Sequence, residues 1–234
     1  MRIAIMQPYF LPYLGYFQLM NLVDVFVIYD EIQYTKKGWI NRNRILVNND
    51  AQTITLPLKK DSDYLNIKDR ILADHWPKER KKLLAKIYNC YKKAPEFDKT
   101  YDLLESIFEY DEQNLFKFIQ FSLKQLMSHF NITTSLVVSS DISFDNKLKS
   151  SDKVLAICRA SEATHYINPI GGLELYDKKQ FEAQDVKLNF LRSNLSIYPQ
   201  FENEFVPGLS VVDAMMFNSP QELSNLIQND FELV

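Results

Sequence analysis

Apolar positions near the start of the chain form runs without alternation. Residues 3–6 and 25–29 are short apolar and β-branched segments ended by polar residues, and residues 14–23 between them are patterned as a helix. Strands that are apolar on both faces are typical of a parallel sheet covered by helices on both sides. The order strand, short helix, strand predicts a βαβ unit with a right-handed crossover.

The middle of the chain has a different pattern. A polar turn at Asn48-Asn49-Asp50 separates residues 44–47 from residues 52–58, which predicts a β-hairpin. Apolar residues then recur at helical spacing, and Pro77 stands at a position typical of a helix start. The helices predicted in this part span residues 77–94, 95–109 and 114–130.

The final third of the chain alternates strands and helices again. Strands are predicted at residues 135–138, 165–168 and 186–191, and helices at residues 151–160, 173–183, 209–217 and 220–228. We therefore predict an α/β fold with one mainly parallel, Rossmann-like sheet built from both ends of the chain. The helices of residues 77–130 are expected as an insertion within a single domain of residues 1–234.

Composition narrows the classes of function. The chain of 234 residues is 46% hydrophobic with a net charge of −3, which does not suggest a nucleic-acid or anionic-membrane binder. Two cysteines are too few for a disulfide framework, and the three histidines have no metal-binding spacing, so no metal site is expected. Pro8 and Pro12 interrupt the apolar N-terminus, and no run approaches the ~20 apolar residues of a membrane span. We expect a soluble, cytoplasmic protein.

The chain has only five glycines, and none lies in its helical middle. Each stands in a segment rich in aromatic or polar side chains. Glycine is used where another group must approach the backbone closely, although glycines also simply mark loops. The five are Gly15, Gly38, Gly171, Gly172 and Gly208.

The first glycine-containing segment, from Gln7 to Tyr16, follows the first predicted strand. Ligands of open α/β sheets bind at the carboxyl ends of strands, so Gln7, Tyr9 and Tyr13 are predicted to bind substrate. The alternative is an aromatic loop that only caps the sheet. This turn also resembles the H-x-G-H turn of HIGH-type nucleotidyltransferases, such as pantothenate synthetases. Tyr13 and Tyr16 stand where the two phosphate-stabilising histidines should be, so both histidines are missing here.

The second segment follows the second strand. Asp30 stands at the carboxyl end of that strand, and four cations, two asparagines and Trp39 come shortly after it. Arginine and lysine bind phosphates, and a tryptophan ring stacks on a base or a sugar. A solvated basic hairpin is the alternative, but a large apolar ring such as Trp39 rarely lies free in such a run. The predicted substrate-binding residues here are Lys36, Lys37, Trp39 and Arg44.

Two further segments lie near the C-terminus. Asn168, Gly171 and Gly172 follow a predicted strand and open a predicted helix, where backbone amides can approach an anion; a plain strand-to-helix turn is the alternative. Gln200 is also predicted to bind substrate. Ser210 and Asp213 are explained by helix capping as well as by a catalytic role. No histidine has the spacing that a Ser–His–Asp triad would need.

Five motifs are distinctive in combination. They are IMQPYFLPYLGYFQ at residues 5–18, GWINRN at 38–43, YINPIGG at 166–172 followed by Leu175-Tyr176, YPQ at 198–200, and residues 207–213. In these motifs the chain resembles the WbqC-like family of bacterial proteins, and the resemblance runs from Met1 nearly to Val234. The middle helices match in pattern only. Because the family is associated with O-antigen gene clusters, the resemblance implies a role in surface-polysaccharide biosynthesis.

The resemblance also implies an activity, the transfer of glycine or a similar acyl group to an amino sugar. We therefore predict a transferase that forms an amide on a nucleotide-activated amino sugar. Asp30 is expected to accept the amine proton, and Asn41, Arg42 or the amides near Gly171 to stabilise the oxyanion. The acyl donor stays open between an acyl thioester, an aminoacyl carrier and an acyl adenylate made from ATP.

Two other functions stay open. One is an ATP-using ligase or nucleotidyltransferase of HIGH-like fold, and the other is a non-catalytic protein that binds a nucleotide sugar or a partner enzyme. The ligand is expected to carry a phosphate or diphosphate, bound by the basic residues of the second segment. Residues from all four segments are expected to meet in one cleft: Gln7, Tyr9, Tyr13, Asp30, Lys37, Trp39, Asn41, Arg42, Asn168, Gly171 and Gln200.

Overall fold

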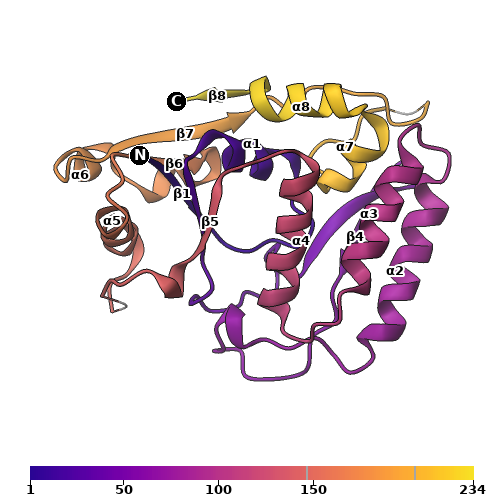
Figure 1. Cartoon of the computed structure of the whole chain (residues 1–234), viewed down its shortest axis with the longest axis horizontal. Helices are drawn as coiled ribbons and strands as arrows, with labels where there is room; N and C mark the ends of the chain where they lie inside the picture. The colour runs from indigo at the N-terminus through magenta and orange to yellow at the C-terminus, as the bar shows by residue number, and fades with distance from the viewer. Residues whose placement is uncertain (146, 203) are drawn as a thin grey trace.

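The computed structural model describes residues 1–145, 147–202 and 204–234. Its main sheet has six strands in the order β5-β2-β1-β6-β7-β8 (Figure 1). Five of them pair in parallel, and β8 pairs antiparallel with β7 at the edge. The predicted α/β fold with a mainly parallel sheet is therefore confirmed. The strands are β1 (Arg2–Met6), β2 (Val25–Ile28), β5 (Ser135–Val138), β6 (His165–Pro169), β7 (Lys187–Ser193) and β8 (Phe231–Leu233).

The order of the strands reverses direction at β1. The chain passes from β1 outward to β2 and β5, and then returns to place β6 and β7 on the other side of β1. This is the order of doubly wound dinucleotide-binding sheets, in which ligands lie at the carboxyl ends of the strands beside the reversal. The sheet therefore indicates the gap between β1 and β6 as the place for a site.

Helices cover both faces of the sheet. Ile3, Ile5 and Val27 point to one face and pack with buried residues of α5 and α6. Ala4 and Phe26 point to the other face and pack with buried residues of α1, α7 and α8. This alternation explains why residues 3–6 of β1 and all of β2 are apolar at successive positions. The helices are α1 (Leu14–Leu22), α5 (Ser150–Ala160), α6 (Lys178–Glu182), α7 (Val211–Phe217) and α8 (Pro220–Asn229).

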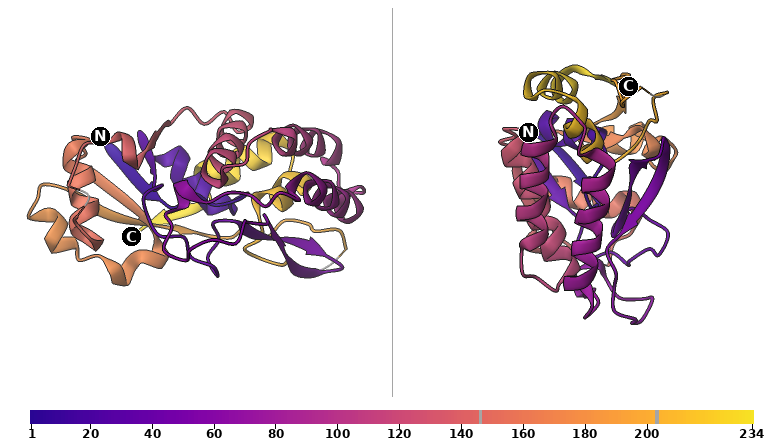
Figure 2. Two further views of the ribbon diagram at one scale, coloured as in Figure 1. Left: turned by 90° about the horizontal axis from the view of Figure 1, so that it is seen from below. Right: turned by 90° about the vertical axis from the view of Figure 1, so that its right-hand side faces the viewer.

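A hairpin and three helices extend the molecule at one end of the sheet (Figures 1 and 2). The elements are β3 (Arg42–Val47), β4 (Asp50–Thr55), α2 (Trp76–Tyr91), α3 (Phe97–Glu109) and α4 (Leu115–His129). Asn48 and Asn49 make the predicted turn with φ angles of 49° and 70°, which asparagine tolerates better than most residues. The predicted hairpin and helices are thus confirmed.

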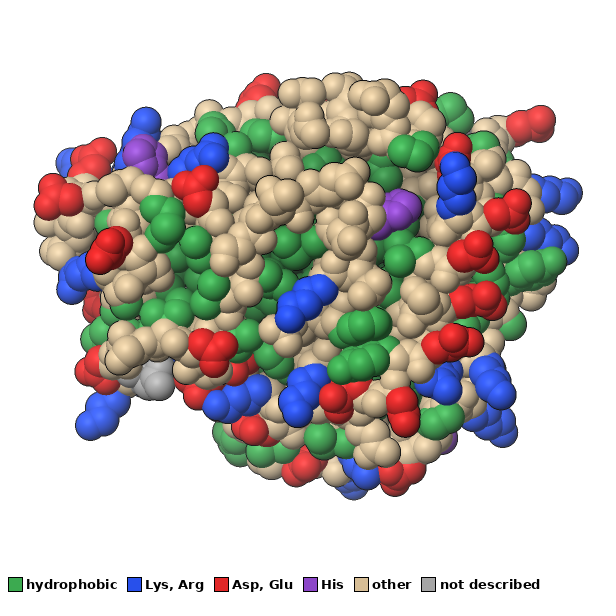
Figure 3. Space-filling view, in the orientation of Figure 1, with side chains coloured by type: hydrophobic (Ala, Val, Ile, Leu, Met, Phe, Trp, Pro, Cys, Tyr) green, Lys and Arg blue, Asp and Glu red, His purple; other side chains and the backbone are tan. Residues whose placement is uncertain are grey.

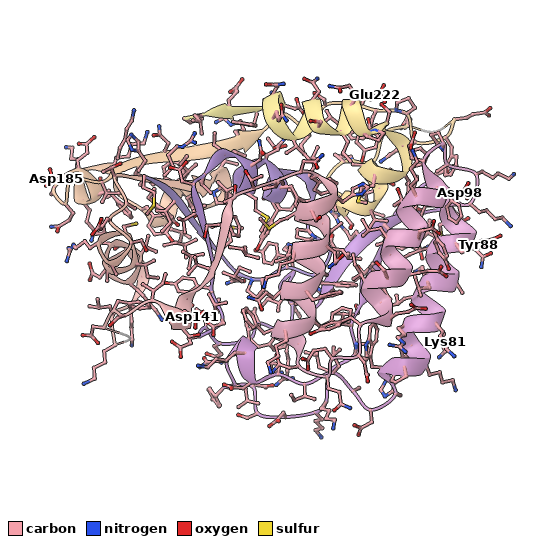
Figure 4. The ribbon with its side chains drawn as sticks, in the orientation of Figure 1. Lys81, Tyr88, Asp98, Asp141, Asp185 and Glu222 are labelled. Carbon is pink, nitrogen blue, oxygen red and sulfur yellow. The ribbon has the colours of Figure 1, made fainter. Side chains whose placement is uncertain are left out.

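The extension shares its core with the sheet. Trp76, Phe108 and Phe118 form an aromatic cluster with ring centroids 5.5 to 6.4 Å apart, and they belong to the same buried cluster as Ala4 of β1. On the outer side of the extension, Lys81, Tyr88 and Asp98 point away from the core (Figure 4). The treatment of residues 1–234 as one domain stays a prediction.

Two details of the sequence-based assignment need correction. The helix predicted at residues 173–183 is wrong, because the chain forms a 3-10 helix at Ile170–Leu175 and then the short α6. Asp177 separates them, since its side chain accepts a hydrogen bond from the amide of Lys179 and starts a new helix. β8 was not predicted, because a three-residue edge strand carries too little pattern.

Candidate functional site

A cavity of about 620 Å³ opens at the carboxyl ends of the central strands, where the strand order reverses. Its wall is rich in tyrosines, which come from different parts of the chain: Tyr9, Tyr13, Tyr29, Tyr166 and Tyr176. The other polar side chains of its lining belong to Gln7, Asn168 and Ser193. Among the residues that the structure describes, no acidic, basic or histidine side chain lines this cavity. The site is therefore aromatic, polar and uncharged.

The loop that carries Tyr9 and Tyr13 is fixed by side chains from distant segments. Asn43 donates through Nδ2 to the carbonyls of Leu11, at 2.7 Å, and Phe10, at 3.1 Å. The hydroxyl of Ser210 donates to the same Leu11 carbonyl at 2.7 Å. Leu11 has a φ angle of 43°, a conformation unfavourable for leucine, so these bonds hold a backbone that would not adopt it alone.

Tyr16 is fully buried in α1, and its hydroxyl donates to the carbonyl of Gln7 at 2.9 Å. Its ring also packs against Tyr9, with centroids 5.6 Å apart. A hydroxyl that is enclosed and already bonded cannot contact a bound phosphate. Tyr16 therefore supports the loop, and it does not take the place of the second histidine of a HIGH-type turn.

Asn168 follows β6 and has both ends of its amide engaged. Its Oδ1 accepts a hydrogen bond from the hydroxyl of Tyr166 at 2.9 Å, and its Nδ2 donates to the carbonyl of Pro169 at 3.0 Å. A Cβ on Gly172 would lie 1.9 Å from that Nδ2, so any other residue here would displace the Asn168 amide. A Cβ on Gly171 would meet no atom within 4 Å, so the backbone there is open to an approaching ligand.

The tyrosine hydroxyls of the cavity are held in their protonated form. Burial raises the pKa of Tyr9, Tyr29 and Tyr176, and it raises the pKa of Tyr13 to about 12, to which the neighbouring Tyr9 contributes. Burial also raises the pKa of Tyr166 well above its ordinary value. Phenols with raised pKa values are hydrogen-bond donors at neutral pH, suited to carbonyl and hydroxyl oxygens.

A smaller compartment of about 250 Å³ adjoins the cavity and shares Tyr9, Tyr13 and Trp39 with it. Here Arg44 enters the lining. The guanidinium carbons of Arg42 and Arg44 lie 5.6 and 5.4 Å from the centroid of the Trp39 ring, which is 38% exposed. Neither arginine forms a salt bridge with a described carboxylate. Two unpaired cations on one indole ring make an electropositive rim beside a neutral cavity.

The rim arises because successive side chains of β3 point to opposite faces of the strand. Arg42 and Arg44 lie on one face of this strand, and Asn43 points to the other, toward the loop that it fixes. Arg42 donates from Nε to the carbonyl of Gly38 at 2.9 Å and also bonds the carbonyl of Lys37. Arg44 donates from Nη2 to the carbonyl of Gly208 at 3.0 Å, while its buried Nε has no hydrogen-bond partner in the described chain.

The structure brings together part of the predicted site. The residues that line the cavity or its adjoining compartment are Gln7, Tyr9, Tyr13, Trp39, Arg44, Asn168, Gly171 and Gly172. Of the predicted site residues, only these eight come together in the cavity and its adjoining compartment. Residues that the prediction missed include Tyr29, Tyr166 and Tyr176. Tyr29 directly follows β2 and precedes the nominated Asp30, so its position at a strand end was the available signal. Tyr166 lies within β6, two residues before the nominated Asn168.

Asp30, Asn41 and Arg42, predicted as catalytic, line neither the cavity nor the adjoining compartment. Asp30 is 2% exposed, and its Oδ1 accepts hydrogen bonds from the hydroxyl of Ser139 at 2.7 Å and the amide of Ser140 at 3.1 Å. Asn41 accepts from the Tyr34 hydroxyl at 2.8 Å and donates to a backbone carbonyl, that of residue 56, at 2.8 Å. These bonds join neighbouring segments, and the catalytic roles stay predictions.

Three predicted binding residues also lie elsewhere. Lys37 is exposed, and Lys36 pairs with Asp63 at 2.8 Å and lines a separate pocket. Gln200 is buried, and its Nε2 donates to Asp213 at 2.6 Å. Two tyrosine hydroxyls donate to the same Asp213 carboxylate, so the YPQ motif serves a buried hydrogen-bond network. The binding roles of these residues stay predictions.

Other classes of site are not indicated. Among the described residues no group of three or more His, Cys, Asp or Glu could hold a metal ion. No helix in the described part of the chain is long and apolar enough to cross a membrane. On the face drawn in Figure 3, acidic and basic side chains intermingle along the lower and right-hand edges.

Comparison with known proteins places the chain in a family. The model of the WbqC-like protein family matches residues 7–225. The chain belongs to the WbqC-like protein family. It is also 29% identical over 232 residues to the uncharacterized protein Rv1507c of Mycobacterium tuberculosis, with 97% of each chain covered. No solved structure matches the chain. The WbqC-like match extends from the tyrosine loop after β1 into α8, so it includes every residue of the cavity that lies C-terminal to Met6.

Proposed function

We propose that this WbqC-like protein is a transferase that joins an acyl group, such as glycyl, in amide linkage to a nucleotide-activated amino sugar. The reaction would serve surface-polysaccharide biosynthesis in the cytoplasm. The observation that carries the proposal is the pairing of an uncharged, tyrosine-lined cavity with an arginine rim across Trp39. The cavity fits a sugar ring, and the rim fits the phosphates attached to it.

The neutral lining suits the amine of the acceptor. An amine attacks an acyl carbonyl only when it is unprotonated, and a carboxylate beside it would stabilise the ammonium form. The described cavity lining carries no carboxylate, and most of its side chains are aromatic or apolar. Such surroundings lower the pKa of an amine and favour the neutral nucleophile.

The protonated phenols suit the acyl carbonyl. In the proposed step the amine nitrogen bonds to the carbonyl carbon, and the bond from that carbon to the donor's carrier breaks. The carrier leaves with the electron pair, and the amine loses its proton to the leaving group or to water. Negative charge develops on the carbonyl oxygen in between, and the Tyr13 hydroxyl and the open backbone at Gly171 can donate to it.

The arginine rim suits the activated half of the acceptor. The Arg44 guanidinium lines the compartment and has no carboxylate partner in the described chain, so it can pair with a phosphate oxygen. Trp39, which lines both the cavity and the compartment, offers a ring face beside the same charge. A nucleotide sugar spans two such subsites because its sugar and its phosphates are directly joined.

One observation favours a second candidate, a protein that binds a nucleotide sugar without catalysis. The described lining of the cavity offers no carboxylate, histidine, lysine or cysteine that could act as base or nucleophile. Acyl transfer from an activated donor can proceed by proximity and carbonyl polarisation alone, which is why the transferase is our first choice.

The test is incubation of the protein with a nucleotide-linked 4-amino sugar and one acyl donor at a time. The donors are glycyl and acetyl thioesters, and glycine with ATP, and the product is followed by mass spectrometry. The proposal expects an N-acylated sugar whose formation falls in Tyr13→Phe and Arg44→Gln. Tight sugar binding without product under every donor would establish the binding protein instead, and absence of both binding and product would overturn both candidates.

A further inference from the structure

A second pocket of about 540 Å³ is lined by residues 34, 36 and 41, by residues 55–63 and by Arg70. It shares no lining residue with the tyrosine cavity or with the Trp39 compartment. The basic segment of residues 36–44 therefore contributes to two pockets, because Arg44 lines the Trp39 compartment and Lys36 lines the second pocket.

Arg70 is the unusual side chain of this pocket. It is only 5% exposed, and it follows the short 3-10 helix Ile67–Asp69. Its Nη1 donates to the carbonyl of Ser62 at 3.0 Å and its Nη2 to that of Lys59 at 3.4 Å. Its guanidinium carbon lies 4.8 Å from the centroid of the Tyr34 ring. These contacts orient the Arg70 guanidinium and hold the backbone of residues 59–62 next to it.

The charge of Arg70 is nevertheless not neutralised. It forms no salt bridge with any carboxylate of the described residues, and its buried Nε has no hydrogen-bond partner among them. A buried cation without a counter-ion is costly, because water has been removed and no opposite charge replaces it. An anion bound in the pocket would supply the missing opposite charge.

The lysines around Arg70 also favour an anion in this pocket. The pocket lining carries four cationic side chains, Lys36, Lys59, Lys60 and Arg70, against two acidic ones, Asp61 and Asp63. This excess of two positive charges stands out in a chain whose net charge is −3. Lys36 and Lys59 pair with Asp63 and Asp74 at exposed positions, where such pairs contribute little and can yield to a ligand.

We infer that this pocket is a second binding site, for the phosphate group of the acyl donor. The inference rests on the proposed transfer reaction, which needs an acyl donor in addition to the sugar. Coenzyme thioesters, carrier arms and acyl adenylates all bear phosphate, so the shared chemistry is a phosphate held by Arg70 and Lys60. Residues 29–41 carry Tyr29 and Trp39 of the first site and Tyr34 of the second, so one segment borders both.

The experiment titrates the isotope-labelled full-length protein with coenzyme A, with pantetheine 4′-phosphate and with ATP, each separately, and follows backbone amide resonances. At least one of these probes should shift the resonances of residues 60–63. Lys60→Glu, at an exposed position with no hydrogen bond or salt bridge in the described structure, should weaken that binding on the order of tenfold, because it reverses a charge beside the phosphate. Lys81→Glu, on the outer side of α2, is the matched control and should leave the affinity unchanged (Figure 4).

Each outcome decides the inference. Binding of coenzyme A or of the pantetheine arm at residues 60–63 supports the pocket and identifies a thioester donor, and binding of ATP there supports it and identifies an adenylate. Absence of binding by all three probes, or affinity that Lys60→Glu and Arg70→Gln both leave unchanged, would overturn it. If Arg70→Gln does not fold, Lys60→Glu alone decides. The proposed function is tested separately, through sugar binding that depends on Arg44.

Discussion

Gly172→Ala should destabilise the fold, whereas Gly171→Ala should not, although the two positions are adjacent. A Cβ at residue 172 would lie 1.9 Å from Nδ2 of Asn168, so the asparagine side chain must turn away. That movement breaks two hydrogen bonds, one from the Tyr166 hydroxyl and one to the carbonyl of Pro169. A Cβ at residue 171 meets no atom within 4 Å.

The magnitude follows from the bonds lost. Two hydrogen bonds at roughly 0.5–1.5 kcal/mol each give a loss of about 1–3 kcal/mol in the free energy of unfolding of Gly172→Ala. Gly171→Ala should leave that free energy unchanged or raise it by up to about 1 kcal/mol, because alanine reduces the entropy of the unfolded chain. For a chain of this size, each kcal/mol lost should lower Tm by about 2–4 °C.

Urea unfolding followed by circular dichroism measures both variants against the wild type. The same samples also test the site, because Gly171 lines the cavity and its added methyl group takes space from a ligand. Equal stability of the two variants would refute the close approach of Asn168 to residue 172. Weaker sugar binding by Gly171→Ala at unchanged stability would place the ligand at this backbone.

Three further predictions test other parts of the structure. Asn43→Ala removes the two bonds that Asn43 donates to the tyrosine loop and should lower the free energy of unfolding by about 1–3 kcal/mol in urea titrations. The exposed Asn225→Ala should change it by less than about 0.5 kcal/mol. Burial lowers the pKa of His129 in the folded state, so the unfolded chain binds a proton at a higher pH than the folded chain does. The free energy of unfolding should therefore fall as the pH drops below about 6.5. His129→Gln should make this free energy depend less on pH, and an equal pH dependence of variant and wild type would contradict the argument. Arg44→Gln should make sugar binding less sensitive to salt, measured as affinity against salt concentration, and an unchanged salt dependence would remove Arg44 from the phosphate subsite.

Much of the fold could be predicted because its signals are local. The apolar runs of β1 and β2, the Asn48-Asn49 turn and the 3.6-residue spacing of α4 each lie within one short segment. The two failures have different causes. The extent of β8 depends on pairing with β7, which is distant in sequence. The break before α6 depends on the Asp177 cap, a local signal that the helix predicted at residues 173–183 did not take into account.

The site could be predicted only in part for a related reason. A strand that begins at Arg42 puts Arg42 and Arg44 on one face and Asn43 on the other, but a strand predicted to begin at residue 44 hides this alternation. Asp30 does stand at the carboxyl end of β2, but its side chain turns to Ser139 after the neighbouring β5. No feature of the segment around Asp30 reveals which distant strand becomes its neighbour.

The central claim is that the tyrosine cavity and the Trp39–Arg44 rim together bind a nucleotide-activated amino sugar. The most direct measurement is calorimetric titration of a nucleotide-linked 4-amino sugar into the wild type, Gly171→Ala and Arg44→Gln. The account predicts one site in the wild type, with affinity lowered on the order of tenfold in each variant, and weaker binding by the free sugar and by the free nucleotide. Absence of binding in the wild type, or equal affinity in all three proteins, would contradict it.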